Sequence, residues 1–212
     1  MNSQFRLLVV SFYFPPYKRV GGRRWAKHLK YLHRDGIHFK VLAGDFSNMT
    51  SPWDKDITDY KGHISRIPIN DLRPYFKKSL PTNLFQKIRW KISLALWTII
   101  KGTSKHDLSD VSRNYHTAFL QKVKLLIDSH QISTIVLSVG PYDYSQLLIR
   151  LRTLYPALGL YIDFRDPWKN NYDPLTERIK KNELIKKHKV LDAVDGIITV
   201  NQELVDYYKH FN

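Results

Sequence analysis

The 212-residue chain contains no cysteine and no long apolar run. The absence of cysteine excludes disulfide frameworks, thiolate zinc sites and cysteine nucleophiles. The longest apolar stretch, residues 92–100, is interrupted by Ser93 and Thr98, whereas a helix that spans a bilayer needs about 20 apolar residues. The short apolar run near the N-terminus lacks the cleavage site of a secretory signal. We therefore expect a chain that does not cross a membrane by itself.

Acidic residues are also scarce, because 19 Asp and Glu stand against 34 Lys and Arg, which gives a formal net charge of +15. The first 130 residues hold 23 of these cations and nine of the anions, a net charge of +14. This asymmetry indicates one basic surface that faces a nucleic acid, an anionic membrane or phosphorylated small molecules. A surface whose charge only keeps the protein soluble is the alternative.

Hydrophobic periodicity predicts six strands with helices between most of them. An apolar run at 5–11 is followed by a Pro- and Gly-rich loop at 12–22, an amphipathic helix at 23–34 and a strand at 37–43. The remaining strands are expected at 64–68, 133–139, 160–164 and 196–200. The remaining helices are expected at 84–101, 110–129, 143–155, 175–191 and from Gln202. This order predicts an α/β domain with a doubly wound, Rossmann-like, mostly parallel sheet of about six strands.

We expect residues 1–212 to form a single domain, with a loop-rich excursion at about 46–83 and a basic amphipathic helix at about 84–101. In such a sheet, ligands bind outside the carboxyl ends of the strands, near the point where the strand order reverses. Four segments should meet there: the loop at 12–22 and the segments after Val139, Phe164 and Val200.

Two adjacent glycines, Gly21 and Gly22, directly precede the helix predicted at 23–34. Backbone N–H groups and the helix dipole make such an N-terminus a site for anions, and glycine lets a ligand approach closely. Arg23 and Arg24 add bidentate donors suited to phosphate. Neither the Gly-x-Gly-x-x-Gly fingerprint of dinucleotide-binding domains nor a Walker loop is present. A glycine-lined turn without a ligand is the alternative interpretation.

Several sequence blocks occur in an order that resembles a known family. The first joins an apolar strand to Phe14-Pro-Pro16, Gly21-Gly22 and Asp35-Gly-Ile-His-Phe-Lys-Val-Leu42. The others are Ser138-Val-Gly-Pro-Tyr-Asp-Tyr-Ser145, Ile162-Asp-Phe-Arg-Asp-Pro-Trp168 and Asp195-Gly-Ile-Ile-Thr-Val200. Together they resemble the N-terminal domain of a family 4 glycosyltransferase of the capsular or exopolysaccharide biosynthesis type. One departure is Ile37, which separates Gly36 from His38.

This resemblance implies the GT-B architecture, in which two Rossmann-like domains face each other. It implies transfer of a sugar, with retention, from a nucleotide-sugar to a lipid-linked saccharide acceptor in surface polysaccharide biosynthesis, with no metal or other cofactor. It places Gly21, Gly22 and Arg23 near the donor diphosphate at the cleft between the domains. In the family the nucleotide is held mainly by the C-terminal domain, and its Glu-x-x-x-x-x-x-x-Glu segment does not occur in this chain. We therefore expect a truncated piece or one partner of a split enzyme, inactive alone.

Many family members carry a histidine that contacts the donor sugar where this chain has Arg165 or Asp166. We expect these two residues to be catalytic, Arg165 by supporting the anionic site and Asp166 by orienting a hydroxyl group. Stabilisation of the charge on the leaving diphosphate would then outweigh acid–base chemistry. An ion pair between Arg165 and a neighbouring Asp that only shapes the loop is the alternative.

Three further residues are expected to contact the acceptor. Tyr142 is placed to stack on a sugar or lipid, Asp143 to bond a hydroxyl group, and Asp163 to present charge at the end of a strand. For Asp143 we favour the alternative that it caps the helix that follows.

The helix predicted at 84–101 has an apolar stripe on one side and tryptophans beside lysines on the other. No acidic residue occurs in it, so it suits an interfacial helix on anionic lipid. A core helix is the alternative. The interfacial reading predicts a cytoplasmic protein that is peripheral on the inner face of the cell membrane. The residues expected to contact the membrane are Lys87, Trp90, Lys91, Trp97 and Lys101.

A second function class remains open beside the glycosyltransferase domain. It is a non-catalytic membrane-docking subunit of a split glycosyltransferase, which recruits a separate donor-binding chain. A nucleic-acid binder is favoured by charge, but the chain lacks any recognisable motif for one. An oxidoreductase is disfavoured because the dinucleotide fingerprint is missing.

Overall fold

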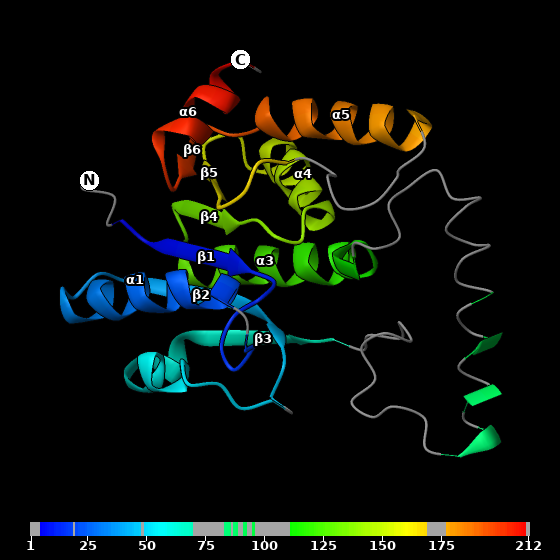
Figure 1. Cartoon of the computed structure of the whole chain (residues 1–212). Helices are drawn as coiled ribbons and strands as arrows, with labels where there is room; N and C mark the ends of the chain where they lie inside the picture. Colours follow the sequence, from blue (N-terminus) through cyan, green and yellow to red (C-terminus); the bar gives the residue numbers. More distant parts are fainter. Residues whose placement is uncertain are drawn as a thin grey trace.

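Six short strands pair side by side into one parallel sheet with the order β3-β2-β1-β4-β5-β6. In Figure 1 they follow one another down the picture, from β6 near the top to β3 near the bottom. The strands are β1 Leu7–Ser11, β2 Phe39–Asp45, β3 Ile64–Pro68, β4 Thr134–Ser138, β5 Gly159–Phe164 and β6 Gly196–Thr199. The order reverses between β1 and β4, which is the switch point of a doubly wound sheet. The predicted fold class is therefore confirmed.

This computed structural model describes most of the chain, and every structural statement below concerns those residues. They are 5–18, 20–47, 49–69, 83–85, 87–88, 91–92, 95, 111–168 and 177–210.

Helices follow most strands, as the periodicity predicts. The α-helices are α1 Arg23–Arg34, α3 His116–His130, α4 Leu147–Leu154, α5 Glu177–Leu191 and α6 Gln202–Lys209. The 3-10 turns are η1 Val20–Gly22, η2 Asp54–Asp56, η3 Thr58–His63, η5 Val111–Tyr115 and η6 Asp143–Gln146. The two helices predicted at 110–129 and 143–155 therefore each begin with a 3-10 turn, η5 and η6.

The core has two layers because side chains of a strand alternate between its faces. Leu7 and Val9 of β1 belong to a cluster with Trp25, Ala26 and Leu29 of α1. Leu8 and Val10 of β1 pack into the larger cluster that α3, α4, α5 and α6 supply on the other face. Because both faces are covered, every residue of β1 is buried. A strand that is buried on both faces has a continuous run of apolar residues, and this run is the pattern that predicted the strand from the sequence.

Part of the loop-rich segment at 46–83 belongs to the sheet. Its strand β3 lies at the edge beside β2, and the turns η2 and η3 precede it. Tyr60 of η3 is 1% exposed and its hydroxyl donates to the carbonyl of Ala26 at 2.7 Å, which ties this segment to α1. Residues 70–82 lie outside the described part of the chain.

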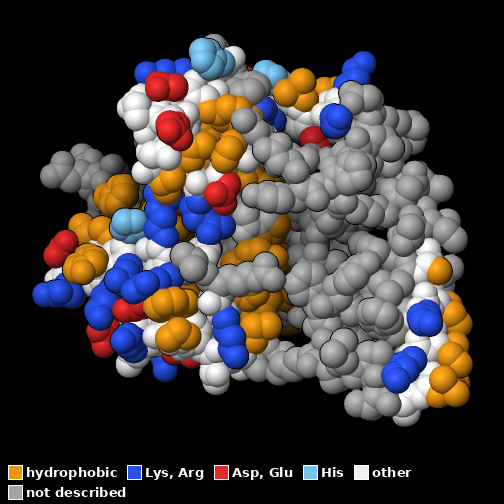
Figure 2. Space-filling model, viewed as in Figure 1, with side chains coloured by type: hydrophobic (Ala, Val, Ile, Leu, Met, Phe, Trp, Pro, Cys, Tyr) orange, Lys and Arg blue, Asp and Glu red, His pale blue; other side chains and the backbone are white. Residues whose placement is uncertain are grey.

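The segment predicted as a basic amphipathic helix is helical at each of its described residues from Leu84 to Ala95. Its described apolar side chains are exposed rather than packed into the core: Leu84 by 74%, Phe85 by 75%, Ile88 by 50% and Ile92 by 56%. On the right-hand edge of Figure 2, apolar atoms line one side of this segment and Lys side chains the adjoining side. The described residues therefore contradict a core helix.

Three residues of the predicted membrane contact, Trp90, Trp97 and Lys101, lie outside the described residues, whereas Lys87 and Lys91 are described and exposed. Among the described residues, no helix has both the length and the hydropathy that crossing a bilayer requires.

Candidate functional site

The guanidinium group of Arg165 lies against two glycines from different loops at the carboxyl ends of the strands. A methyl group on Gly21, at the start of α1, would lie 2.6 Å from Nη1 of Arg165. One on Gly140, in the loop after β4, would lie 2.8 Å from Nη2. Gly140 also has a φ of +112°, which side-chain-bearing residues rarely adopt. Glycine is therefore required at both positions for the guanidinium group to sit here.

The predicted convergence of the Gly21-Gly22 turn and the Arg165-Asp166 turn is thus observed. We call Gly21, Gly22, Gly140 and Arg165 the switch-point cluster, because they follow β1, β4 and β5 around the reversal of strand order. Ligand sites of doubly wound sheets lie at this edge.

Arg165 has no carboxylate partner in the described part of the chain, and its buried Nε makes no hydrogen bond there. The ion pair of this region joins other residues, Arg24 and Asp163, with Nη1 and Oδ1 2.9 Å apart. The alternative prediction of an Arg165–Asp pair that shapes the loop is therefore not observed. A guanidinium group that has no carboxylate partner among the described residues is suited to an anionic ligand with paired oxygens.

Asp163 organises helix α1. Its side chain has no exposed surface, Oδ2 accepts a hydrogen bond from Nε1 of Trp25 at 2.7 Å, and Oδ1 pairs with Arg24. This corrects the expectation that Asp163 contacts an acceptor, because a fully buried carboxylate engaged on both oxygens leaves no surface for one. Its contacts instead fix the first turn of α1, next to Gly22, against β5.

His28 lies one turn after Arg24 on α1, with its ring edge-on to Trp25 at 5.6 Å. Burial lowers the pKa of His28 below 6.5, the charge of Arg24 lowers it further, and Asp163 acts in the opposite direction. The imidazole is therefore mostly neutral at pH 7. The sequence pattern does not single out this histidine, because its setting depends on the fold of two distant segments.

Tyr142 holds the turn that carries Arg165. Its ring stacks on Trp168 with centroids 5.3 Å apart, and its hydroxyl donates to the carbonyls of Pro167 at 3.2 Å and Asp166 at 3.4 Å. Trp168 is 5% exposed, and its backbone N–H donates to the Tyr208 hydroxyl at 2.9 Å. Where we expected Tyr142 to stack on a sugar or lipid, one face of its ring is occupied by Trp168.

Asp143 is 6% exposed and pairs with Lys186 of α5 at 2.6 Å, while Nε2 of Gln146 donates to it at 2.9 Å. Burial would lower the pKa of Lys186, but its hydrogen bonds to Asp143 and Glu183 and their charges raise it. The favoured capping role is wrong, because Asp143 lies inside η6 and Tyr142 is the N-cap. Asp143 instead joins η6 to α5, and the expected contact with an acceptor does not match its burial.

Arg23 is the first residue of α1, and its guanidinium carbon lies 4.0 Å from the ring centroid of Trp53, a cation–π contact. Neither the contact with Trp53 nor the Trp25–Asp163 hydrogen bond was predicted from the sequence. The Trp25–Asp163 hydrogen bond could have been expected on chemical grounds, because a buried indole N–H needs an acceptor and few acceptors are available at a strand end.

Asp166 is the exposed residue of the turn, and its side chain has no hydrogen-bond partner in the described part of the chain. Among the described residues, no three His, Asp or Glu side chains gather closely enough to hold a metal ion.

No protein-family model and no curated protein matches the chain. The N-terminal domain of trehalose-6-phosphate phosphatase from Candida albicans is a solved structure that is similar at 15% identity, with a TM-score of 0.47. The match covers 91% of this chain and 39% of that one, so the chain spans less than half of its length. A likeness at this level carries no functional argument, and the fold class rests on the sheet topology itself.

Proposed function

We propose that the chain is the acceptor-side domain of a glycosyltransferase, which transfers a sugar from a nucleotide-sugar to a lipid-linked saccharide in surface polysaccharide biosynthesis. The observation that carries the proposal is the Arg165 guanidinium group, seated on Gly21 and Gly140 at the switch point without a carboxylate partner in the described residues. The resemblance of the sequence blocks to family 4 glycosyltransferases supplies the reaction.

In the proposed reaction the acceptor hydroxyl oxygen bonds to the anomeric carbon of the donor sugar. The bond from that carbon to the nucleoside diphosphate breaks, and the hydroxyl proton passes to the departing diphosphate. Negative charge gathers on the diphosphate, which is where a fixed guanidinium group lowers the barrier most. We assign charge stabilisation to Arg165 and orientation of a hydroxyl group to Asp166, whose side chain is exposed beside it. The nucleotide itself is held by a second domain in this proposal.

The first test is binding of uridine diphosphate, a nucleoside diphosphate like the leaving group of the proposed reaction, followed by tryptophan fluorescence. Arg165→Gln is expected to weaken binding about tenfold, the typical effect of losing one charge-assisted bidentate contact. Arg150→Gln is the matched control, because Arg150 is exposed on α4 and its loss changes the net charge equally. Equal affinities for the two variants would remove the assignment.

The second test is transfer of radiolabelled sugar from a panel of nucleotide-sugars to lipid in membranes of the producing cells. The full natural protein, together with any donor-binding partner, is expected to label lipid, and Arg165→Gln is expected to lower the rate about 100-fold or more. Labelling that does not depend on Arg165 or Asp166, while binding does, favours the second candidate. That candidate is a non-catalytic docking subunit, and the exposed apolar side chains at 84–92 are what favours it.

We also propose that this apolar face rests on anionic lipid at the inner surface of the cell membrane, with Lys87 and Lys91 beside it. Phe85→Asp should abolish sedimentation with phosphatidylglycerol vesicles, and wild-type binding should weaken as salt rises. Leu125→Asp is the control, because Leu125 on α3 is also exposed, by 62%. Vesicle binding that survives Phe85→Asp would contradict this placement.

A further inference from the structure

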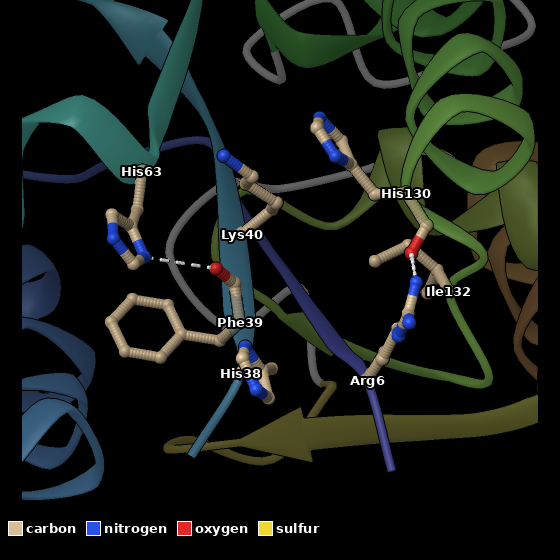
Figure 3. A pocket seen from close by; sticks show the side chains of 7 residues that line it. All are labelled: Arg6, His38, Phe39, Lys40, His63, His130 and Ile132. Atoms are coloured by element: carbon tan, nitrogen blue, oxygen red, sulfur yellow. Dashed lines mark hydrogen bonds between the residues drawn. The ribbon is translucent and has the colours of Figure 1, made fainter. Parts of the chain in front are cut away.

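A basic hollow lies at the opposite end of the sheet from the switch-point cluster. It has a volume of about 220 Å³. Its lining comes from residues that precede or open the strands β1, β2 and β4, from the end of η3 and from the end of α3. The seven lining residues are Arg6, His38, Phe39, Lys40, His63, His130 and Ile132 (Figure 3).

Five of the seven lining side chains are basic and none is acidic. Nη1 of Arg6 donates to the carbonyl of His130 at 3.1 Å, which fixes the guanidinium group beside the hollow. In Figure 3 the side chains of Lys40 and His130 extend in the same direction from neighbouring elements. Burial lowers the pKa of His130, and the positive charges of Lys40 and Arg6 lower it further. The cluster therefore repels a further positive charge as long as no anion lies within it.

His63 shows how the hollow is prepared for hydrogen bonding. Its Nδ1 lies 3.1 Å from the carbonyl oxygen of Phe39, and since that oxygen can only accept, Nδ1 carries the proton. The ring is further fixed by edge contact with His33 at 5.5 Å and a tilted contact with Phe39 at 5.0 Å. Nε2 is then the ring nitrogen that does not contact the Phe39 carbonyl.

We propose that this hollow, which we call the amino-end pocket, binds a phosphoryl group through Lys40, His38, His63 and His130, with Arg6 supporting it. A phosphoryl group offers several acceptor oxygens and close to two negative charges near pH 7, which matches a cluster of donors from four separate elements. The volume exceeds more than tenfold the 10–15 Å³ or so that a single water needs, so it accommodates such a group. This site is independent of the proposed transfer reaction, which uses the other end of the sheet.

The test is titration of the isotopically labelled protein with pyrophosphate in low-salt, phosphate-free buffer, followed by the ring resonances of its histidines. The resonances of His38, His63 and His130 should shift together, and Lys40→Gln should weaken the apparent affinity about tenfold. Lys122→Gln is the matched control, because Lys122 is half-buried on α3 and lies outside the pocket lining. Titration in an Arg165→Gln background separates this site from the switch-point cluster and should leave the shifts unchanged.

A second arm identifies the source of the phosphoryl group. If sedimentation with vesicles that contain phosphatidic acid, whose phosphate is a monoester, falls in Lys40→Gln but not in Lys122→Gln, the ligand is a lipid headgroup. If only the pyrophosphate titration separates the two variants, the ligand is a soluble phosphate compound. Equal behaviour of the two variants in both arms, or histidine shifts that depend on Arg165 instead, would overturn the proposal.

Discussion

The two ends of the parallel sheet handle charge in opposite ways. At the carboxyl end, buried Asp163 pairs with Arg24 and accepts a hydrogen bond from Trp25, whereas Arg165 has no carboxylate partner in the described residues. At the amino end, the pocket around Lys40 collects five basic side chains and no acid. The first end is organised before any ligand arrives, whereas the second is a repulsive cluster that a ligand would relieve.

The largest effect should come from breaking the buried pair at the carboxyl end. Asp163→Ala removes the acceptor of the Trp25 indole and strands the partly buried Arg24, whose side chain is 23% exposed. We expect the free energy of unfolding in urea to fall by about 3 kcal/mol. Asp166→Ala, a change at the exposed neighbour, should stay within about 0.5 kcal/mol of wild type. Similar losses for the two variants would mean that the carboxyl end is not organised by Asp163.

A smaller loss is expected from filling the space on which Arg165 rests. Gly140→Ala places a methyl group 2.8 Å from Nη2 at a φ of +112°, so we expect a cost of about 2 kcal/mol and weaker uridine diphosphate binding. Gly62→Ala is the control, since its added methyl group meets nothing within 4 Å and no positive φ is involved. Stability and binding that both tolerate Gly140→Ala would show that the close contact with Arg165 is incidental.

A smaller effect is expected in the pH dependence of stability, through His28 near the carboxyl end of the sheet. Burial and then Arg24 lower the pKa of His28 from its unfolded value of 6.5, so the unfolded chain binds more protons than the folded one. The contribution of His28 is fully present above pH 6.5 and is lost as pH falls through the lowered pKa. Urea unfolding at pH 7.5 and 5.5 should show this loss, and His28→Gln should reduce it. An unchanged slope in that variant would place the titration elsewhere.

The smallest effect should have the opposite sign. Lys40→Gln at the amino end removes one member of a like-charge cluster, so we expect a gain of about 0.3 kcal/mol at low salt that shrinks as salt rises. Arg24→Gln at the carboxyl end should destabilise instead, because it breaks an ion pair with a buried carboxylate. Changes of the same sign in both variants would remove the contrast between the ends.

Much of the fold was predictable from local pattern alone. The helix at 23–34 and the strand at 64–68 have the predicted bounds, and the other strands differ by at most two residues at either end. These bounds could be predicted because hydrophobic periodicity and the glycines that flank each element are local features of the sequence. The 3-10 starts of the helices at 110–129 and 143–155 were not predicted, because their cause is packing against neighbouring elements rather than composition.

The position of the site was predictable from the sequence, whereas the roles of its residues were less so. Gly21, Gly22 and Arg165 were singled out and lie together. Asp143 and Asp163 were chosen for the same reason, polarity at a strand end, yet both are buried and bonded to helices. A carboxylate that faces a ligand and one that fixes a helix look alike in sequence, because the partner that decides between them lies far away in the chain.

The sequence by itself therefore determined the elements, their parallel order and the residues that end at the switch point, since each depends on patterns within a few neighbouring positions. Tertiary structure alone decided which charges are paired, which aromatic rings hold the 165–168 turn, and that Arg6, Lys40 and His130 meet at the amino end. The physical reason is that burial and Coulomb interactions depend on distances in space between residues that are far apart in the chain, by as many as 138 positions for Trp25 and Asp163.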